Sequence, residues 1–223
     1  MKPRTKLAET TTTDGGKLTL YEHDGAFSIL IDGLELMHSK ATASEILLGE
    51  RGVARIQKGD AGRVLIGGLG LGYTLAAVLE HTGKKVRVDV AELIPEVIDW
   101  NHRFLQELNG GLLGKERVHI HEGDVTPLIK RAAPETWDVI LLDIDNGPTP
   151  MVAKHNASLY SARGIEAVRE ALTRKGRAIF WSASSDKPFA TRLRKAGFDV
   201  QVIPAMVHDR AKKPSYLLYV ADK

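Results

Sequence analysis

The chain has 223 residues, of which 43% are hydrophobic and 26% charged, and its net charge is +3. These values are typical of a globular protein with one medium domain and a small additional unit. No apolar run approaches the roughly 18 residues that cross a membrane. The first residues lack the apolar core of a secretory signal. We therefore expect no membrane partner.

Cysteine is absent, which excludes disulfides, thiolate metal sites and a cysteine nucleophile. Its absence also fits a cytoplasmic location. The small positive charge does not imply a polyanionic partner, so we expect no nucleic acid to bind. His119 and His121 lie two positions apart without a third ligand nearby, and we expect no metal.

The N-terminal segment predicts a small β-domain. Two Asp-Gly pairs, Asp24-Gly25 and Asp32-Gly33, divide residues 17–37 into three short β-prone runs. Asp-Gly between such runs is a strong hairpin signal, so we expect a three-stranded antiparallel meander. A helical stretch follows at 43–56. We expect a first domain over residues 1–50 and a second over residues 51–223.

From Arg63 onward, β-prone and helix-prone segments alternate, which predicts an α/β fold with a mostly parallel sheet covered on both faces. A closing pair of strands is expected to be antiparallel. The expected strands are 63–70, 85–93, 117–124, 137–145, 177–184, 199–207 and 215–222. The expected helices are 73–82, 95–108, 125–133, 160–176 (closed by Gly176) and 188–198.

Ligands of such sheets bind at the carboxyl ends of the strands. The first of these ends carries Gly67, Gly68, Gly70 and Gly72. The spacing is Gly-x-Gly-x-Gly rather than the Gly-x-Gly-x-x-Gly of dinucleotide sites, which leaves the turn bare for an amino-acid tail and a ribose. A tight strand-to-helix turn without a ligand is the alternative.

Acidic residues follow at the next strand ends. Glu92 lies about twenty residues after the glycines, where a carboxylate accepts ribose hydroxyls. Asp124 either reads an adenine amino group or caps the helix that begins at Val125. Asp143 and Asp145 leave a strongly apolar strand, where carboxylates are costly unless they have a function. Together these signals indicate a site for S-adenosylmethionine or a related ligand.

The order of these motifs resembles the spermidine synthase family, the polyamine aminopropyltransferases. The motifs are LIDGLELM (30–37), VLIGGLGLG (64–72), VAELIPEVIDW (90–100), VHIHEGD (118–124), WDVILLDID (137–145) and LYSARGIEAVREAL (159–172). The resemblance covers about residues 17–205. It implies a Rossmann-like class I methyltransferase fold behind a small N-terminal β-domain. It also implies S-adenosylmethionine or its decarboxylated form as co-substrate, and a homodimer.

Three departures from the family pattern affect the expected chemistry. Gly70 stands where the family has an aspartate that contacts the amino tail of decarboxylated S-adenosylmethionine. Lys40 stands in the substrate-binding motif, of which only Glu45 is retained. The catalytic motif is shortened to DIDNGP, in which Asp143 matches the first aspartate while Asp145 and Asn146 approximate the second. The loss of acids favours ordinary S-adenosylmethionine and methyl transfer by a small margin.

Asp143 is therefore the expected base and a co-substrate contact, with Asp145 and Asn146 as further catalytic candidates. The expected substrate contacts are Glu45, His155 and Tyr160. Trp181 lies near the end of a strand that is expected to point toward the site.

Three functions stay open. Methyl transfer to a small-molecule acceptor needs a group that binds the co-substrate carboxylate, for which His38 and Lys40 are candidates. Aminopropyl transfer to a polyamine needs an acidic acceptor channel, for which Glu22, Asp24 and Glu45 are candidates. The third possibility is a catalytically silent nucleoside-binding protein.

Overall fold

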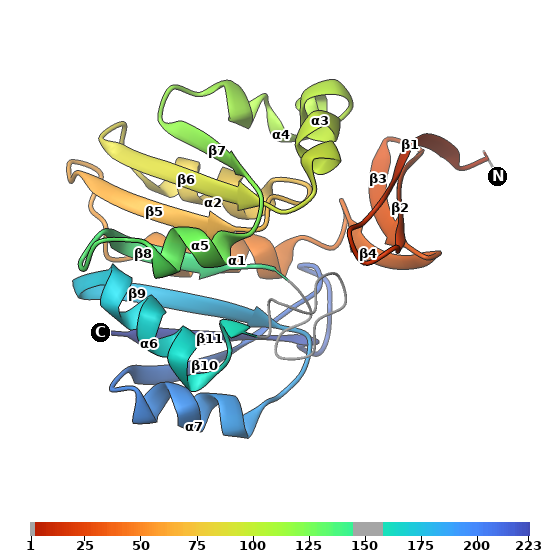
Figure 1. Cartoon of the computed structure of the whole chain (residues 1–223). Coiled ribbons are helices and arrows are strands. Elements are labelled where there is room, and N and C mark those ends of the chain that lie inside the picture. The colour runs from red at the N-terminus through yellow and green to blue at the C-terminus, as the bar shows by residue number, and fades with distance from the viewer. Residues whose placement is uncertain (1–2, 145–157) are drawn as a thin grey trace.

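The computed structural model describes residues 3–144 and 158–223. Asp145, Asn146 and His155 lie outside the described residues. The described chain forms a four-stranded sheet near the N-terminus and a seven-stranded sheet with helices on both faces (Figure 1). The smaller sheet lies beside the carboxyl edge of the larger one. The division into domains at residue 50 stays a prediction.

The N-terminal sheet is an antiparallel meander. Asp24 and Asp32 take left-handed backbone angles, with φ of 51° and 49°, and the glycine after each does the same. Such paired positive φ angles give the tight hairpin turns that Asp-Gly predicts. The expected meander is confirmed, but it has four strands rather than three. The strands are β1 (Thr5–Thr11), β2 (Lys17–His23), β3 (Ala26–Ile31) and β4 (Leu34–His38).

The first strand was missed because its sequence, TKLAETT, is mostly polar and its residues are exposed or half-buried in the sheet. It lacks the alternation of buried apolar residues that identifies a strand from sequence.

The large sheet has the strand order β10-β11-β9-β8-β5-β6-β7. Its central pairs are parallel, whereas β11 runs antiparallel to both β9 and β10, so the expected mostly parallel sheet with an antiparallel last strand is confirmed. The strands are β5 (Gly62–Gly67), β6 (Val86–Glu92), β7 (Val118–Glu122), β8 (Trp137–Leu142), β9 (Leu172–Ser182), β10 (Asp199–Ala205) and β11 (Tyr216–Asp222).

Helices cover both faces of this sheet and bury a separate apolar cluster on each (Figure 1). One cluster contains residues of α5, α6 and α7, and the other contains residues of α1 and α2. The helices are α1 (Ala43–Val53), α2 (Tyr73–His81), α3 (Pro95–Arg103), α4 (Gln106–Asn109), α5 (Val125–Lys130), α6 (Ala162–Ala171) and α7 (Lys187–Lys195), with a 3₁₀ turn η1 (Leu112–Gly114).

The helix expected to end at Gly176 ends earlier. Helix α6 stops at Ala171, and Gly176 lies within β9. The pairing of β8 with β9 shifts register strongly here, from Trp137 opposite Leu172 to Val139 opposite Arg177. Glycine inside a strand commonly marks such an irregularity, and here it was mistaken for a helix end.

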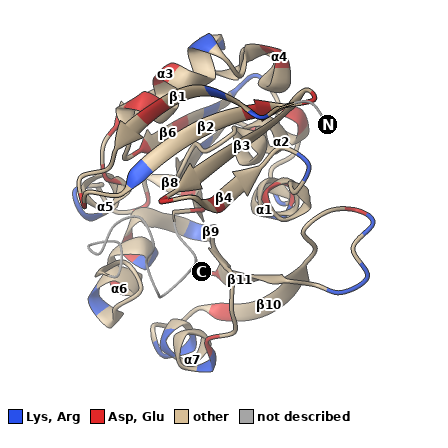
Figure 2. Ribbon diagram, turned by 90° about the vertical axis from the view of Figure 1, so that its right-hand side faces the viewer, with Lys and Arg blue, Asp and Glu red and all other residues tan. Residues whose placement is uncertain are grey.

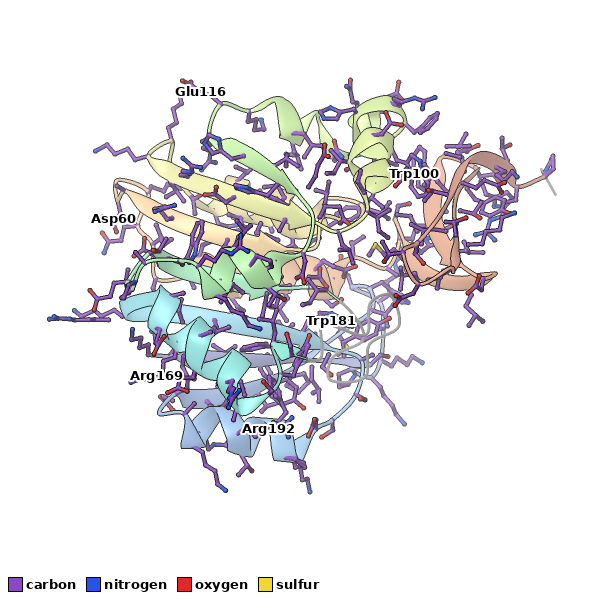
Figure 3. The ribbon with its side chains drawn as sticks, in the orientation of Figure 1. Asp60, Trp100, Glu116, Arg169, Trp181 and Arg192 are labelled. Atoms are coloured by element: carbon purple, nitrogen blue, oxygen red, sulfur yellow. The ribbon has the colours of Figure 1, made fainter. Side chains whose placement is uncertain are left out.

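A third apolar cluster joins the N-terminal sheet to α3. Leu18 and Ile29 of the sheet pack in it with Val97 and Trp100 of the helix. Trp100 lies between the sheet and the helix in Figure 3. This contact holds the small sheet over the strand ends of the large one. Within residues 3–144 and 158–223, no helix is long and apolar enough to span a membrane.

The basic stretch HDRAKKPS (208–215) lies in the loop between β10 and β11, which extends away from the sheet (Figure 2). Arg210, Lys212 and Lys213 are exposed there. These basic side chains form a solvated charged surface, as is usual for a charge run.

Candidate functional site

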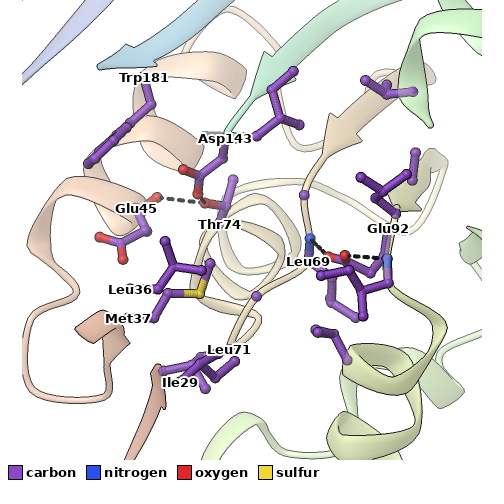
Figure 4. A pocket seen from close by; sticks show the side chains of 18 of the residues that line it. Ile29, Leu36, Met37, Glu45, Leu69, Leu71, Thr74, Glu92, Asp143 and Trp181 are labelled. Carbon is purple, nitrogen blue, oxygen red and sulfur yellow. Dashed lines mark hydrogen bonds between the residues drawn. The ribbon is translucent and has the colours of Figure 1, made fainter. Parts of the chain in front are cut away.

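A pocket lies between the carboxyl ends of β5, β6 and β8 and the inner face of the N-terminal sheet (Figure 4). It encloses about 1100 Å³ of space free of atoms, including the solvent at its mouth. The polar and glycine lining residues are Glu45, Gly68, Gly70, Tyr73, Thr74, Glu92, Gly123, Asp124 and Asp143. The apolar lining residues include Leu18, Ile29, Leu36, Met37, Leu71, Ile94, Val97, Ile144 and Trp181.

The glycine turn brings the first strand end close to the third. Gly68 has φ of +93°, and a Cβ at this position would lie 2.1 Å from the carbonyl oxygen of Asp143. Only glycine fits so close to another backbone at that angle. Gly68 and Gly70 line the pocket. Gly67 ends β5 and Gly72 precedes α2, and neither is among the lining residues.

Glu92 is a buried carboxylate that holds the glycine turn in place. Its Oε2 accepts a hydrogen bond from the backbone N–H of Leu69 at 2.9 Å, and its Oε1 accepts one from Ile94 at 2.9 Å. Burial raises the pKa of Glu92, and these backbone donors partly oppose the rise. Glu92 is therefore a buried carboxylate and not a solvated one at the end of its strand. Backbone hydrogen bonds from Gly70 and Leu93 also lower the pKa of Glu92. The residue lines the pocket, and its contact with ribose hydroxyls stays a prediction.

Asp124 caps helix α5 and also lines the pocket. Its Oδ1 accepts a hydrogen bond from the backbone N–H of Thr126 at 2.7 Å, which makes it the N-cap of α5. It also lines the pocket on the side of Glu92 and Gly123. The cap is confirmed, and contact with an adenine stays a prediction.

Asp143 and Glu45 face the same part of the pocket, with Thr74 between them (Figure 4). The Thr74 hydroxyl donates to Oδ2 of Asp143 at 3.1 Å. Burial, together with the charge of Glu45, raises the pKa of Asp143 to about 7. Burial also raises the pKa of Glu45. Asp143 can therefore exchange a proton near neutral pH, which suits a general base.

Two glycines determine how deep Glu45 lies. A Cβ at Gly49 would lie 2.6 Å from Cβ of Ala77 in α2, and a Cβ at Gly52 would lie 2.6 Å from Leu141 in β8. Helix α1 therefore packs directly against its neighbours, backbone to side chain. This close packing brings Glu45, in the first turn of α1, next to Asp143.

Met37 and Trp181 form two walls of the pocket. Met37 of β4 covers the glycine turn, so a Cβ at Gly70 would lie 2.6 Å from its Sδ. Trp181, at the end of β9, lines the pocket as its strand position suggests, and its buried indole Nε1 has no hydrogen-bond partner among residues 3–144 and 158–223. Its ring contacts Tyr216 at 4.7 Å between centroids. Met37 ends the LIDGLELM motif, which predicts the β-domain but gives no sign of a pocket contact.

Several expected contacts lie elsewhere. Tyr160 is buried in the core, with its ring 5.3 Å from Phe189 and 6.0 Å from Phe180, so its placement does not support a substrate contact. His38 and Lys40 are not among the lining residues. Glu22 and Asp24 line a separate surface hollow at the N-terminal hairpin. Within the described chain, no cluster of three or more potential metal-binding side chains occurs.

No family model matches the chain. Polyamine aminopropyltransferases of Mycobacterium tuberculosis and Mycobacterium bovis are 29% identical over 156 residues, covering 65% of this chain. The match spans only 28% of the length of these curated relatives.

Among solved structures, a spermidine synthase in complex with the transition state analogue AdoDATO superposes with a TM-score of 0.72 at 19% identity. The match covers 96% of this chain and 72% of that one. Spermidine synthase from Thermotoga maritima gives 0.71 at 20% identity, with the same coverage. A probable spermidine synthase from Corynebacterium glutamicum gives 0.71 at 14% identity, covering 100% of this chain and 81% of that one.

The sheet order, the glycine turn and the acidic residues at successive strand ends define a class I S-adenosylmethionine-dependent methyltransferase-like fold. Within that class, the chain is a distant homologue of the spermidine synthase family, the polyamine aminopropyltransferases.

Proposed function

We propose that this chain transfers an aminopropyl group from decarboxylated S-adenosylmethionine to the amine of a small acceptor. The observation that carries this proposal is the sign of the charges in the pocket. The ionisable carboxylates Glu45, Glu92, Asp124 and Asp143 line it, whereas no lysine, arginine or histidine does so among the described residues.

The charge pattern distinguishes the two forms of the co-substrate. Decarboxylated S-adenosylmethionine carries only positive charges, on the sulfonium and on the amino group of its tail. Ordinary S-adenosylmethionine adds a carboxylate, which would be repelled by Glu45 and Asp143 and would find no described cation in the pocket. The names of the relatives support the same choice.

The chemistry requires one base and one fixed geometry. The lone pair of a neutral acceptor amine forms the new C–N bond to the propyl carbon. The C–S bond breaks, and its electron pair stays on sulfur, which leaves neutral 5′-methylthioadenosine. The secondary ammonium that forms then gives its proton to the Asp143 carboxylate. We propose that Glu92 binds the ribose hydroxyls, that Asp124 binds the adenine, and that Glu45 binds a substrate ammonium.

Methyl transfer from ordinary S-adenosylmethionine is the competing function, because Gly70 provides no acid to reject a carboxylate. Against this function, no cationic side chain among the described residues lines the pocket to bind the co-substrate carboxylate. Lys40 is exposed and His38 accepts a hydrogen bond from the backbone N–H of Lys40 at 3.0 Å, and neither lines the pocket.

Calorimetric titration with the two co-substrates tests the proposal directly. We expect decarboxylated S-adenosylmethionine to bind at least tenfold more tightly than the ordinary form. Incubation with putrescine should then release 5′-methylthioadenosine, and Asp143→Asn should abolish this release without abolishing binding. Tighter binding of the ordinary form would overturn the proposal in favour of methyl transfer. Binding without turnover for any amine would favour a silent nucleoside-binding protein.

The assembly and location of the protein are further proposals. We infer a homodimer and a cytoplasmic location from the resemblance and from the absence of cysteine. Sedimentation of the purified protein tests the first, with a monomer as the contradicting result.

A further inference from the structure

Asn101 is a buried amide in α3 that contacts the glycine turn without lining the pocket. Its Nδ2 donates to the carbonyl oxygen of Gly70 at 2.9 Å and to that of Val97, one turn earlier in the helix, at 2.8 Å. Its Oδ1 accepts from Nδ2 of Asn109 at 2.7 Å. Both donors and the acceptor of this side chain are therefore used.

The orientation of the Asn101 amide follows from its partners. The carbonyl oxygens of Gly70 and Val97 can only accept, so the nitrogen of Asn101 must face them. An oxygen in that place would lie against two other oxygens. The Nδ2 of Asn109, facing the opposite side of the amide, favours the same orientation.

The hydrogen-bonded chain continues to the surface. Asn109 ends α4, and its Oδ1 accepts from the backbone N–H of Gly111 at 3.2 Å. Gly110 and Gly111 form an exposed turn with φ of 66° and 64°. Three hydrogen bonds thus connect this turn, through Asn109 and Asn101, to Gly70 at the pocket.

The glycine turn is held at two consecutive residues by two different side chains. Glu92 accepts from the N–H of Leu69, and Asn101 donates to the carbonyl of Gly70, each at 2.9 Å. Gly70, at φ of +52°, lacks a Cβ to restrict its backbone. Its conformation therefore depends on these anchors.

We propose that Asn101 is a positioning residue for the nucleoside co-substrate, and that Asn109 keeps the Asn101 amide in its working orientation. Asn101 acts through the backbone of Gly70 rather than by touching the ligand. The inference rests on the proposed function in one respect, namely that the ligand beside the glycine turn is an adenosyl compound.

The test measures binding of 5′-methylthioadenosine, the neutral nucleoside product, by calorimetry, with melting temperature followed in parallel. Asn101→Asp keeps the shape of the side chain but replaces its donors, and Asn109→Ala removes the neighbour that orients it. The matched control, Gln106→Glu, makes the same amide-to-carboxylate change on exposed α4. We expect at least a tenfold higher Kd for Asn101→Asp, about threefold for Asn109→Ala and no change for the control.

A merely structural role would lower the melting temperature of both variants and leave Kd unchanged in the folded fraction, and this result overturns the proposal. Asn109→Ala tests it even where Asn101→Asp does not fold, because Asn109 lies closer to the surface. A wild type that binds the nucleoside but transfers nothing to amines refutes the proposed function alone, while the Kd comparison still decides the role of Asn101. A wild type that binds no nucleoside overturns both.

Discussion

Thr74 donates a hydrogen bond of 3.1 Å to Oδ2 of Asp143, and its hydroxyl also lies 3.4 Å from the backbone carbonyl of Glu45 (Figure 4). A hydroxyl has one proton and can donate to only one of the two. When Asp143 is ionised, Thr74 donates to it. When Asp143 is protonated, the acid can donate to Thr74, which then turns to the carbonyl. Thr74 can therefore satisfy Asp143 in both protonation states.

Removal of this hydroxyl should change the pH dependence of transfer. Thr74→Val takes away a donor that lowers the pKa of Asp143, so the apparent pKa in kcat/KM should move upward from about 7. At pH 7 we expect kcat/KM to fall about tenfold. Thr74→Ser, which retains the donor, is the control and should follow the wild type. Identical pH profiles for Thr74→Val and Thr74→Ser would contradict this role of the Thr74 hydroxyl.

The wild-type rate should itself rise with pH around neutrality. Asp143 must be ionised to accept a proton, and its pKa is about 7, so kcat/KM should increase between pH 6 and 8. The acceptor amine, with a pKa of about 10 in water, adds a second rise at higher pH. In Glu45→Gln the first inflexion should move to lower pH, because the charge of Glu45 raises the pKa of Asp143. An unchanged inflexion in this variant would exclude that coupling.

Ionisation of Asp143 should make the folded protein less stable at pH 8 than at pH 4. Its folded pKa of about 7 exceeds the ordinary value of 3.8, so the folded state binds more protons between these values. Stability is therefore lost as pH rises from about 4 to about 7. Since each unit corresponds to about 1.4 kcal/mol, the loss is at most of order 4 kcal/mol.

Asp143→Asn should remove this pH dependence. We expect the variant to unfold at higher urea concentration than the wild type at pH 8 and to differ little at pH 4.5. If Asp143→Asn is instead more sensitive to urea than the wild type at pH 8, the surroundings of Asp143 stabilise its ionised form more than its burial suggests.

The position of Glu45 should depend on Gly49. A methyl group there would lie 2.6 Å from Cβ of Ala77 and 2.8 Å from the carbonyl of Thr74, so Gly49→Ala must move α1 outward. We expect a loss of about 1–3 kcal/mol in the free energy of unfolding and a several-fold higher KM for the amine. Gly59→Ala, where a Cβ meets no atom within 4 Å, is the control. Equal KM values in the two variants would separate Glu45 from acceptor binding.

The arrangement of the pocket floor could be predicted because it follows from topology. In a parallel sheet the carboxyl ends of the strands meet at one edge, so Gly68, Glu92, Asp124 and Asp143 had to lie near one another. The sequence periodicity also predicted the parallel sheet and its antiparallel last strand.

What could not be predicted depends on contacts between distant segments. Asn101 and Gly70 are 31 residues apart, and no local pattern distinguishes Asn101 from a surface amide of an amphipathic helix. Met37 reaches the pocket only because the N-terminal sheet packs on α3. The lean toward methyl transfer weighed the single positions Gly70 and Lys40, whereas the proposed aminopropyl transfer rests on the charges of all the lining residues, which only the fold brings together.

The contact between Met37 and Gly70 couples substitutions at these two positions. An aspartate introduced at Gly70 alone would need a left-handed backbone, which aspartate tolerates, but its Cβ would also collide with the Met37 thioether. Shortening Met37 first would open that space at the cost of some apolar contact. Substitutions at positions 37 and 70 should therefore be non-additive, because the N-terminal sheet supplies the side chain that any residue larger than glycine at position 70 must displace.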